Sequence, residues 1–346
     1  MLLSAVHRIS AIAGVFSVLI PAAVHAQYPL VPTPVLPLGS LSSSITVGGY
    51  VSVRDTKHGD STSFTVNRAR LTAMIAPLPY LAVRVQTDFS GNQSEAVSDN
   101  TVHGFELTDA YVELAQPAAD SLTWGQWHPA LIVGQFKQPF SLEYLTSFAY
   151  LRTANRAAAI DALTPKRDIG VMAQVQWSRF VTADASVTNG QGANALSNPN
   201  GLELLIGRVT VTPFPWLALA ATLGDEGTDH IKGYDGRIEW RDLLIEGEGI
   251  HRSRPLSGEH QDAGGGYVLG AYKVLPWLQP VFKREWFSDT RQLDGTNTNT
   301  QQDWSTFGVN VITPKENLRF LVDWIVKSQR PTTTQNEVDF QLVANF

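Results

Sequence analysis

The sequence contains no cysteine, which excludes folds held together by disulfides and metal sites built from thiolates. Charged residues are also scarce, because they make up 17% of the 346 residues, against about a quarter in soluble domains. The formal net charge is -6, so the chain lacks the basic character of a protein that binds duplex nucleic acid. No apolar run after residue 26 approaches the length of a membrane-spanning helix. The apolar residues, 43% of the chain, must therefore be covered in another way.

The beginning of the chain predicts an export signal. A weakly basic start precedes an almost wholly apolar stretch over residues 9–24, and the small residues Val24 and Ala26 stand where a signal peptidase cleaves. This stretch is shorter than the roughly 20 residues that a membrane anchor needs. We therefore expect a signal peptide over residues 1–26. Four prolines and a run of serines predict that residues 27–44 form an extended periplasmic lead-in rather than a domain.

Apolar and polar residues alternate along the rest of the chain. In the stretch 318–328, Phe320 and Trp324 lie on one face, opposite Arg319 and Asp323. Alternation with a period of two predicts β-strands, because a helix would place its apolar residues three and four apart. The predicted strands are sixteen in number and span residues 45–54, 64–76, 80–89, 105–115, 122–136, 168–178, 180–188, 202–212, 216–224, 232–240, 242–252, 264–274, 277–287, 303–313, 318–328 and 337–346.

The connections between these strands are of two kinds. One kind is short and rich in proline or charge, as at Pro77-Leu-Pro79 and Pro213-Phe-Pro215. Short turns at one end and long loops at the other are typical of outer-membrane barrels. The other kind is longer and polar, and comprises residues 55–63, 90–104, 189–201, 225–231, 253–263, 288–302 and 329–336, with the longest at about 137–167.

Alternation alone fits a soluble β-sandwich as well as a membrane barrel, so two further features decide between them. Aromatic residues such as Tyr80 and Trp216 gather beside the short turns, where an interfacial girdle belongs. Charges recur in register, as with Arg68 and Arg70, too often for a dry core. We therefore predict an all-β fold in which residues 45–346 form a 16-stranded antiparallel transmembrane β-barrel with short periplasmic turns and long extracellular loops.

Three motifs in the first half of the mature chain resemble a known family. The most specific is Val133-Gly-Gln-Phe-Lys-Gln-Pro-Phe-Ser-Leu-Glu143, accompanied by Asn67-Arg-Ala-Arg-Leu71 and Lys166-Arg-Asp-Ile-Gly-Val171. They resemble the phosphate-selective porins O and P, and the terminal Phe346 resembles the signal that outer-membrane assembly recognises. The resemblance implies a trimeric channel in the bacterial outer membrane, surrounded by its lipid and lipopolysaccharide. It also implies that the third long loop folds inward and that arginines on the lumen wall guide anions.

The connection at about 137–167 is the only one long enough to cross the lumen, and it carries five basic residues against two acidic ones. Charges of one sign in a narrow pore concentrate counter-ions. Arginine suits phosphate or carboxylate because its planar fork bonds two oxygens at once. Alternation adds arginines of the first strands to the lumen wall. The candidate pore-lining and anion-contacting residues are Arg68, Arg70, Arg84, Lys137, Arg152, Arg156, Lys166 and Arg167.

The same residues allow a purely structural alternative. The wall arginines would then pair with Asp88, Asp109 and Glu113 on neighbouring strands, and the loop arginines would fix the loop to the wall. Further acidic residues on the polar faces, such as Glu248 and Asp323, also oppose an anion preference if they face the lumen unpaired.

No catalytic or phosphate-loop motif is found in the sequence, and its histidines are scattered singly, so we expect no enzyme activity, no cofactor and no metal site. The function predicted is that of an outer-membrane porin through which small hydrophilic solutes diffuse passively, with a preference for anions such as phosphate. Two alternatives stay open: a plugged or scaffolding barrel that binds other envelope proteins, and an outer-membrane hydrolase assembled from distant strands.

Overall fold

The computed structural model describes residues 35–37, 44–90, 105–115, 127–256, 258–293, 296–330 and 334–346. The expected signal peptide and most of the expected lead-in lie outside these residues. Within them, neither α-helix is long or apolar enough to cross a bilayer.

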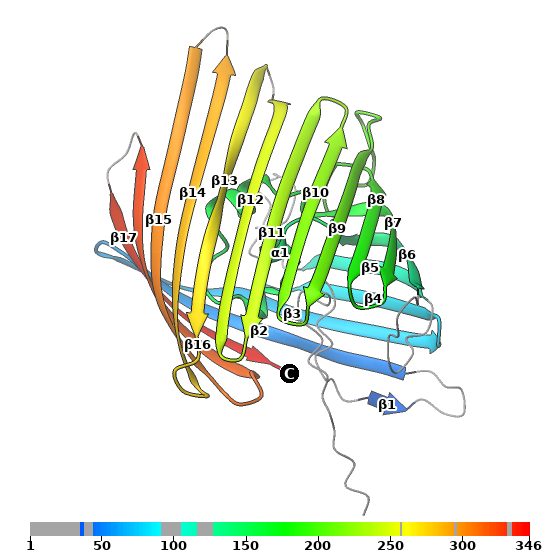
Figure 1. The fold of residues 1–346 in the computed structure, drawn as a ribbon, viewed down its shortest axis with the longest axis horizontal. Coiled ribbons are helices and arrows are strands. Elements are labelled where there is room, and N and C mark those ends of the chain that lie inside the picture. Colours follow the sequence, from blue (N-terminus) through cyan, green and yellow to red (C-terminus); the bar gives the residue numbers. More distant parts are fainter. Residues whose placement is uncertain are drawn as a thin grey trace, which may run out of the picture.

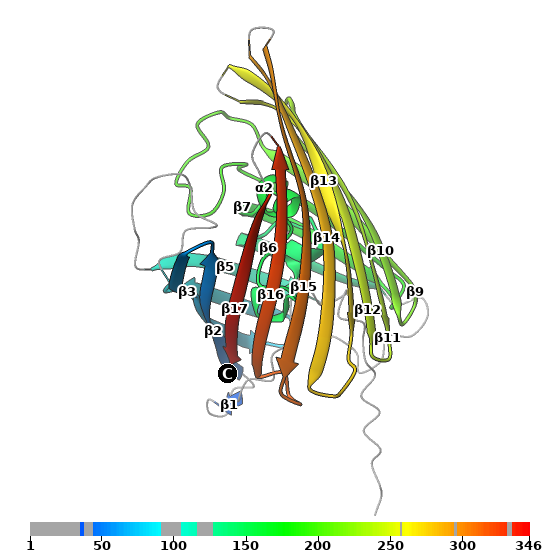
Figure 2. The same ribbon diagram turned by 90° about the vertical axis from the view of Figure 1, so that its left-hand side faces the viewer.

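Sixteen antiparallel strands form a closed barrel, as the sequence predicts (Figures 1 and 2). The ring closes because the last strand pairs with the first, with Phe340 opposite Asp55. A short additional strand, β1 (Val35–Pro37), pairs with the start of the first barrel strand. The barrel strands are β2 (Ser44–His58), β3 (Ser61–Leu78), β4 (Leu81–Asp88), β5 (Glu106–Ala115), β6 (Trp127–Lys137), β7 (Arg167–Trp177), β8 (Val181–Thr188), β9 (Leu204–Phe214), β10 (Leu217–Glu226), β11 (Asp229–Trp240), β12 (Leu243–Leu256), β13 (Glu259–Tyr272), β14 (Leu278–Leu293), β15 (Thr296–Ile312), β16 (Leu318–Arg330) and β17 (Gln335–Asn345).

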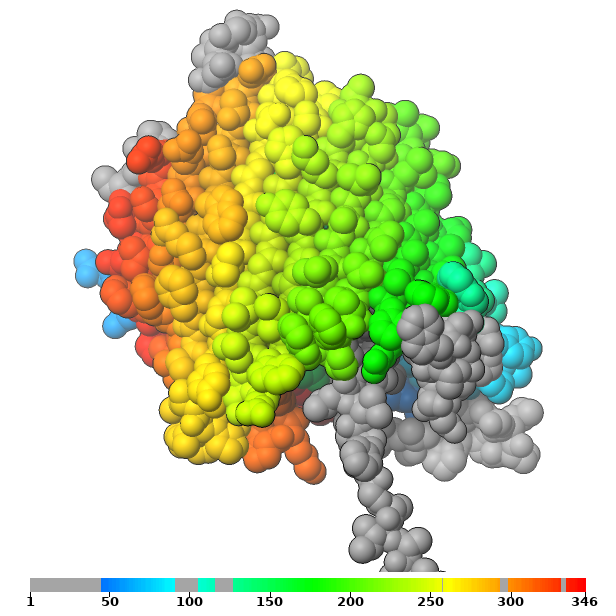
Figure 3. Space-filling view, viewed as in Figure 1, coloured from blue at the N-terminus to red at the C-terminus, as the bar shows by residue number. Residues whose placement is uncertain are grey.

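The wall of the barrel is apolar outside and polar inside. On β9, Leu205 and Val209 are each 49% exposed, whereas Arg208 and Thr212 are buried on the lumen side. The outer wall over β10–β14 is a continuous surface of side chains (Figure 3). A soluble sandwich would show the opposite arrangement, so this distribution is that of a membrane barrel.

Aromatic rings gather at the end of the barrel where the strands are joined by short turns. Phe214 and Trp216 stack with ring centroids 5.1 Å apart, and Trp240 meets Trp216 edge to face at 5.6 Å. We call this end the short-turn end and the opposite end the loop end. Rings at this height suit the polar–apolar boundary of a bilayer.

Most of the polar connections predicted at the loop end differ from the structure, because the strands continue through them. β2 runs to His58 and β3 begins at Ser61, where the sequence predicts a loop over 55–63. The predicted loops 225–231, 253–263 and 288–302 are likewise shortened by paired strands. The reason is that both faces of these strand ends are polar, so the hydrogen-bonded ladder persists where the hydrophobic alternation has already stopped.

Between β6 and β7 the chain turns into the barrel. Residues 138–166, which we call the inward segment, contain α1 (Leu142–Leu145), a 3₁₀ turn η1 (Phe148–Tyr150) and α2 (Ala158–Leu163). Figures 1 and 2 show this segment enclosed by the wall. Its position agrees with the inward-folded loop that the family resemblance implies.

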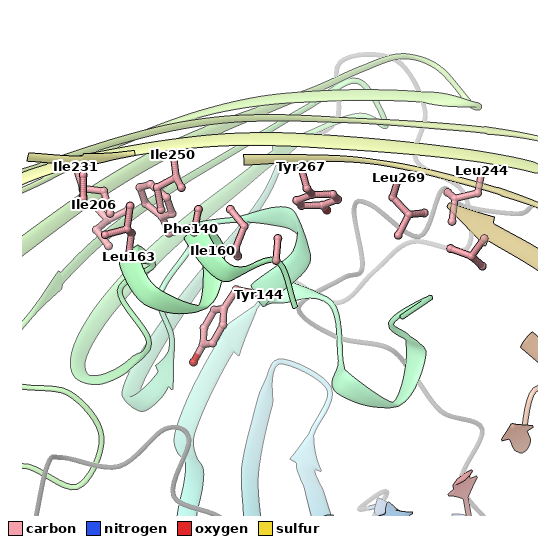
Figure 4. Packing of buried hydrophobic residues seen from close by; sticks show 14 of the residues in the cluster. Phe140, Tyr144, Ile160, Leu163, Ile206, Ile231, Leu244, Ile250, Tyr267 and Leu269 are labelled. Atoms are coloured by element: carbon pink, nitrogen blue, oxygen red, sulfur yellow. The ribbon is translucent and has the colours of Figure 1, made fainter. Parts of the chain in front are cut away.

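One side of the inward segment packs on the inner face of β9–β14 through apolar side chains. Phe140, Ile160 and Leu163 meet wall residues that include Ile206 and Tyr267, all at most 1% exposed (Figure 4). Tyr144 points away from these strands on the other side of the segment (Figure 4). The lumen wall is therefore not uniformly polar, because the part of it under the segment is covered with an apolar patch.

Two glycines of the wall make room for this contact. A Cβ atom added at Gly233 would lie 2.9 Å from the Phe140 ring, and one added at Gly265 would lie 2.7 Å from the Cβ of Ala159. Both distances are shorter than van der Waals contact. Glycine at these positions therefore lets the segment approach the strands closely.

Candidate permeation site

The wall opposite this apolar patch carries a pair of arginines that share one carboxylate. The Arg167 Nε donates a hydrogen bond of 2.6 Å to Asp109 Oδ1, and the Arg84 Nε donates one of 3.0 Å to Asp109 Oδ2. Asp109 belongs to β5, between Arg84 on β4 and Arg167 on β7. All three side chains are at most 12% exposed. The pairing with Asp109 that the structural alternative proposed is therefore present.

Lys137 and Arg167 stand directly opposite each other on β6 and β7, where two like charges destabilise a sheet unless each has another partner. The Lys137 Nζ donates 2.7 Å to the carbonyl oxygen of Tyr144, while Arg167 turns to Asp109. The last residue of β6 and the first residue of β7 thus place two cations at the base of the inward segment.

A small polar cavity lies between the inward segment and this wall. The cavity has a volume of about 40 Å³, which is room for a few waters or for one small oxyanion in their place. Its polar lining also includes Gln86, Tyr111 and Ser147. The charged residues that line the cavity are Arg70, Arg84, Lys137, Arg167 and Asp109, four cations against one anion.

Arg70 is held by a different carboxylate. Its Nε donates 2.8 Å to Asp88 Oδ2, and the Nε of Arg68 lies 3.8 Å from the same oxygen. Asp88 also accepts from the backbone N–H groups of Ala69 and Ser90, so it fixes the end of β4. It is not part of the cavity lining.

Cations and aromatic rings alternate where the inward segment meets β3. Arg68 lies over the Phe148 ring at 5.0 Å, and Arg156 lies 5.4 Å from the same ring and 4.8 Å from the ring of Tyr144. The Lys137 Nζ also lies over the Tyr144 ring, 5.1 Å from its centroid. Each such contact stabilises by about 0.5 kcal/mol at an exposed site and by about 2 kcal/mol when it is buried. This row fastens the segment to the wall on the side opposite the apolar patch.

Three acidic residues of the lumen wall accept hydrogen bonds from the backbone of the inward segment. Asp323 accepts 2.6 Å from the N–H of Ala154, Glu285 accepts 3.2 Å from the N–H of Ala158, and Glu248 accepts 3.1 Å from the N–H of Glu143. Wall cations complement them, because the following residues donate to backbone carbonyl groups of the segment: Arg54, Arg252, Lys283 and Arg319.

An irregular segment inside a barrel needs partners for its backbone groups, and these wall charges supply them. Glu248, Glu285 and Asp323, three of the acidic side chains that oppose an anion preference, are thus engaged by N–H groups of the segment. They do not stand unpaired in the lumen.

The structure divides the predicted anion-contacting residues into two groups. It brings Arg70, Arg84, Lys137 and Arg167 together at the cavity. The remaining four do not line this cavity: Arg68 and Arg156 lie in the cation–aromatic row, Lys166 lies 3.8 Å from Asp161, and Arg152 lies 3.6 Å from Glu316 at the short-turn end. Contact of these residues with a permeating anion stays a prediction.

Glu316 connects the inward segment to the turns of the short-turn end. Lys273 donates 3.2 Å to it, and Arg152 and Arg319 lie close by. Burial alone would raise the pKa of Glu316, but the three cations outweigh burial and hold the pKa below its ordinary value. Glu316 is therefore a charged anchor for Arg152.

Glu143 is the one titratable group of the inward segment that is both buried and close to other carboxylates. Its Oε2 accepts 2.8 Å from the N–H of Ala157. Burial raises the pKa of Glu143 to about 7, although Lys283 at 3.9 Å opposes the shift; the neighbouring Glu285 adds to it. This carboxyl therefore changes charge near neutral pH.

Sequence reasoning missed the aromatic partners of the cations and the polar lining of the cavity. Tyr111 lies two positions from Asp109 on β5, so strand alternation was a signal that would have placed it on the lumen side. Nothing local predicts that Phe148 and Tyr144 meet Arg156. Among the described residues, no group of three or more His, Asp or Glu is arranged to hold a metal ion.

Comparison with protein families gives a match to the phosphate-selective porins O and P over residues 46–224. This is more than half of the chain. The chain belongs to this family. It is therefore a porin, and it resides in the bacterial outer membrane.

Solved porin structures share the fold of this porin at low sequence identity. A loop-deletion form of OmpT, an outer membrane protein of Vibrio cholerae, aligns with a TM-score of 0.65 at 12% identity, over 88% of this chain and 100% of the other. The anion-selective porin of Comamonas acidovorans aligns with a TM-score of 0.61 at 11% identity, over 88% and 100%. OmpF of Salmonella typhi aligns with a TM-score of 0.64 at 8% identity, over 90% and 100%. A sequence search of curated proteins found no match.

Proposed function

We propose that this porin carries small hydrophilic anions such as phosphate across the outer membrane by passive diffusion. The observation that supports the proposal is the cavity between the inward segment and the wall, which four cations and one carboxylate line. Fixed charges of one sign beside a narrow passage raise the local concentration of counter-ions. No bond is made or broken in this process.

Two further observations support an anion preference. Wall carboxylates outside the cavity, such as Asp323 and Glu285, are engaged by backbone N–H groups of the inward segment, whose dipoles offset part of their negative charge. Arg84 and Arg167 present guanidinium groups, which can bond two oxygens of an oxyanion at once. The anion-selective porin of Comamonas acidovorans shows that a barrel of similar fold can have this selectivity.

We also propose that the porin is a homotrimer in contact with outer-membrane lipid and lipopolysaccharide, with its short turns in the periplasm. One of the similar structures, OmpT of Vibrio cholerae, is described in a trimer form. The expected signal peptide over residues 1–26 and lead-in over 27–44 remain part of this proposal, with the constriction at about 137–167.

The test is the reversal potential of the porin in a planar bilayer under a salt gradient, first with chloride and then with phosphate. We expect the sign that marks anion selectivity. Replacing both Arg84 and Arg167 with glutamine should shift the reversal potential toward the cation, because two of the four cavity cations are lost.

Arg284→Gln is the matched control, since Arg284 lies on the outer wall, 46% exposed and paired with Asp303. It should leave the reversal potential unchanged. Cation selectivity of the natural porin would refute the proposal. A complete lack of conductance would instead favour a plugged scaffolding barrel, which the close packing of the inward segment makes the second candidate.

A further inference from the structure

A groove of about 720 Å³ crosses the outer wall of β8–β12 near the loop end. Strands β9–β12 face the viewer in Figures 1 and 3. The row faces away from the lumen, because Leu223 is 69% exposed whereas the preceding residue, Thr222, is 2% exposed. The residues that pair across successive strands in this row are Ala185, Gly207, Leu223, Lys232 and His251.

Small residues form the floor of the groove. Ala185 and Gly207 stand side by side on β8 and β9, and no atom lies within 4 Å of a Cβ added at Gly207. Val187, Leu205 and Leu223 surround them with apolar, exposed side chains. A groove of this volume is large enough for a small molecule, and its apolar floor suits a hydrocarbon chain.

A cation stands beside this apolar floor. Lys232 belongs to the same row and is exposed. Within the part of the chain that the structure describes, no hydrogen bond or ion pair engages its ammonium group. The histidines of the groove differ, because His230 Nδ1 lies 2.6 Å from Asp225 Oδ2, and His251 Nε2 lies 3.0 Å from Asp262 Oδ1. Lys232 is thus available to an anionic ligand.

The height of Lys232 in the wall is close to that of lipid headgroups. It stands eight positions along β11 from Trp240, which belongs to the aromatic rings of the short-turn end. A strand rises about 3.3 Å per residue and a barrel strand tilts by about 40°, so Lys232 lies roughly 20 Å from that ring along the barrel axis. The apolar band of such a barrel is about 25 Å tall. The long side chain of Lys232 therefore reaches the polar boundary of the outer leaflet.

We propose that this groove binds one phosphorylated lipid of the outer leaflet, with an acyl chain along Gly207 and a phosphate group on Lys232. The inference rests on the proposed contact with outer-membrane lipid and lipopolysaccharide, and it adds the site of that contact. A phosphate oxygen accepts a charge-assisted hydrogen bond from an ammonium group, and basic residues near the membrane surface attract anionic lipids. A free phosphate ion would need the cation alone, whereas a lipid uses both the cation and the apolar floor beside it.

The experiment is native mass spectrometry of the purified full-length porin in detergent, titrated with lipid A that carries two phosphates. We expect one tightly held lipid A per protomer. Lys232→Gln removes one charge-assisted hydrogen bond to phosphate and should weaken binding by roughly tenfold. Gly207→Leu fills the groove and should weaken binding at least as much. With lipid A stripped of its phosphates, Gly207→Leu should still weaken binding, whereas Lys232→Gln should not.

Matched controls separate the groove from the rest of the wall. Lys57→Gln removes another exposed lysine, on β2 at the loop end. Gly270→Leu adds the same side chain to β13 outside the groove, where an added Cβ also has no atom within 4 Å. Both should bind lipid A within about twofold of the natural porin. An excess of inorganic phosphate should not release the lipid.

The outcomes distinguish the groove from the proposals on which it rests. If lipid A binds and neither Lys232→Gln nor Gly207→Leu weakens it, the groove is refuted and the contact with lipid stands elsewhere on the wall. Release of the lipid by inorganic phosphate would show a simple anion site and refute a lipid site. If Gly207→Leu instead separates the protomers, the groove is an interface between copies and the inference fails. If no lipid A binds, the proposed lipid contact fails as well, and anion transport is judged separately by the reversal potential.

Discussion

Glu143 shows how one residue links the inward segment to pH. Its pKa is raised to about 7 from an ordinary 4.5. Between these two pH values the carboxyl of Glu143 keeps its proton in the folded porin, whereas the unfolded chain has released it. Its carboxyl is neutral below this window. As pH rises from about 4.5 to 7, the folded state increasingly has to carry a buried negative charge, so the stability falls. Lys283 and Arg156 attract the charged form, and Glu285 repels it.

We therefore expect the porin in detergent to withstand more urea at pH 5 than at pH 8. The part due to Glu143 is at most about 3 kcal/mol, from the size of its pKa change. Glu143→Gln should flatten this difference, because glutamine carries no charge at either pH. Urea midpoints at the two pH values are the measurement. An equally steep pH dependence in Glu143→Gln would show that another group is responsible.

Among the elements, the inward segment is the one that we propose as the constriction of the channel. It is held by an apolar patch toward β9–β14, by a cation–aromatic row toward β3, and by hydrogen bonds from the wall charges between them. The contacts on opposite sides mean that the segment has little freedom to move while all are present. A change at one contact should then alter conductance rather than the barrel itself.

Gly233→Val tests this at a single contact. The new side chain would overlap the Phe140 ring, which a Cβ atom alone already approaches to 2.9 Å. We expect the segment to shift away from β11 and the single-channel conductance and its noise to rise. Gly207→Val is the control, because no atom lies within 4 Å of a Cβ added at Gly207. Equal conductance of the two variants would mean that the segment tolerates the displaced ring.

At the scale of the whole molecule, the barrel is arranged inside out relative to a soluble protein. Val209 and Thr210 are neighbours on β9, the first exposed on the outer wall and the second on the lumen side. The two side chains have nearly the same shape, so exchanging them tests which face meets lipid.

We expect Val209→Thr to lower the free energy of unfolding by about 1 kcal/mol, because it places a hydroxyl group against lipid. Thr210→Val faces the lumen and should have a smaller effect. Folding in lipid vesicles, followed by urea titration, measures both. The reverse order of the two effects would contradict a lipid-facing outer wall.

Much of this architecture was accessible from the sequence, for reasons that particular segments show. Strand β16 was predicted almost to its bounds, since Phe320 and Trp324 alternate with Arg319 and Asp323, and the structure places the first pair outside and the second inside. The strand ends near residues 58 and 293 were missed because their two faces are both polar. The apolar covering of the lumen wall was also missed, because the sequence gives no sign that the inward segment needs it.

The candidate site was predicted only in part. Alternation placed Arg70 and Arg84 on the lumen wall, and the charge of the connection drew attention to Lys137 and Arg167. The same reasoning treated Arg152 as equivalent to them, whereas it lies near Glu316 at the short-turn end. Arg152 was misplaced because it lies in an irregular segment. Such a segment has no repeating pattern from which the direction of each side chain can be predicted.

The sequence by itself determined that the chain forms a closed apolar-outside barrel, because each strand carries its own two-residue pattern and lipid allows no open edge. It also determined the family, through short motifs on three strands and one loop. Only the tertiary structure decided which charges meet. Asp109, Arg84 and Arg167 meet from three different strands, and Asp323 accepts a hydrogen bond from the backbone of Ala154 in the inward segment. Such pairs depend on strand register and on the course of the inward segment, and both are set by packing over the whole molecule.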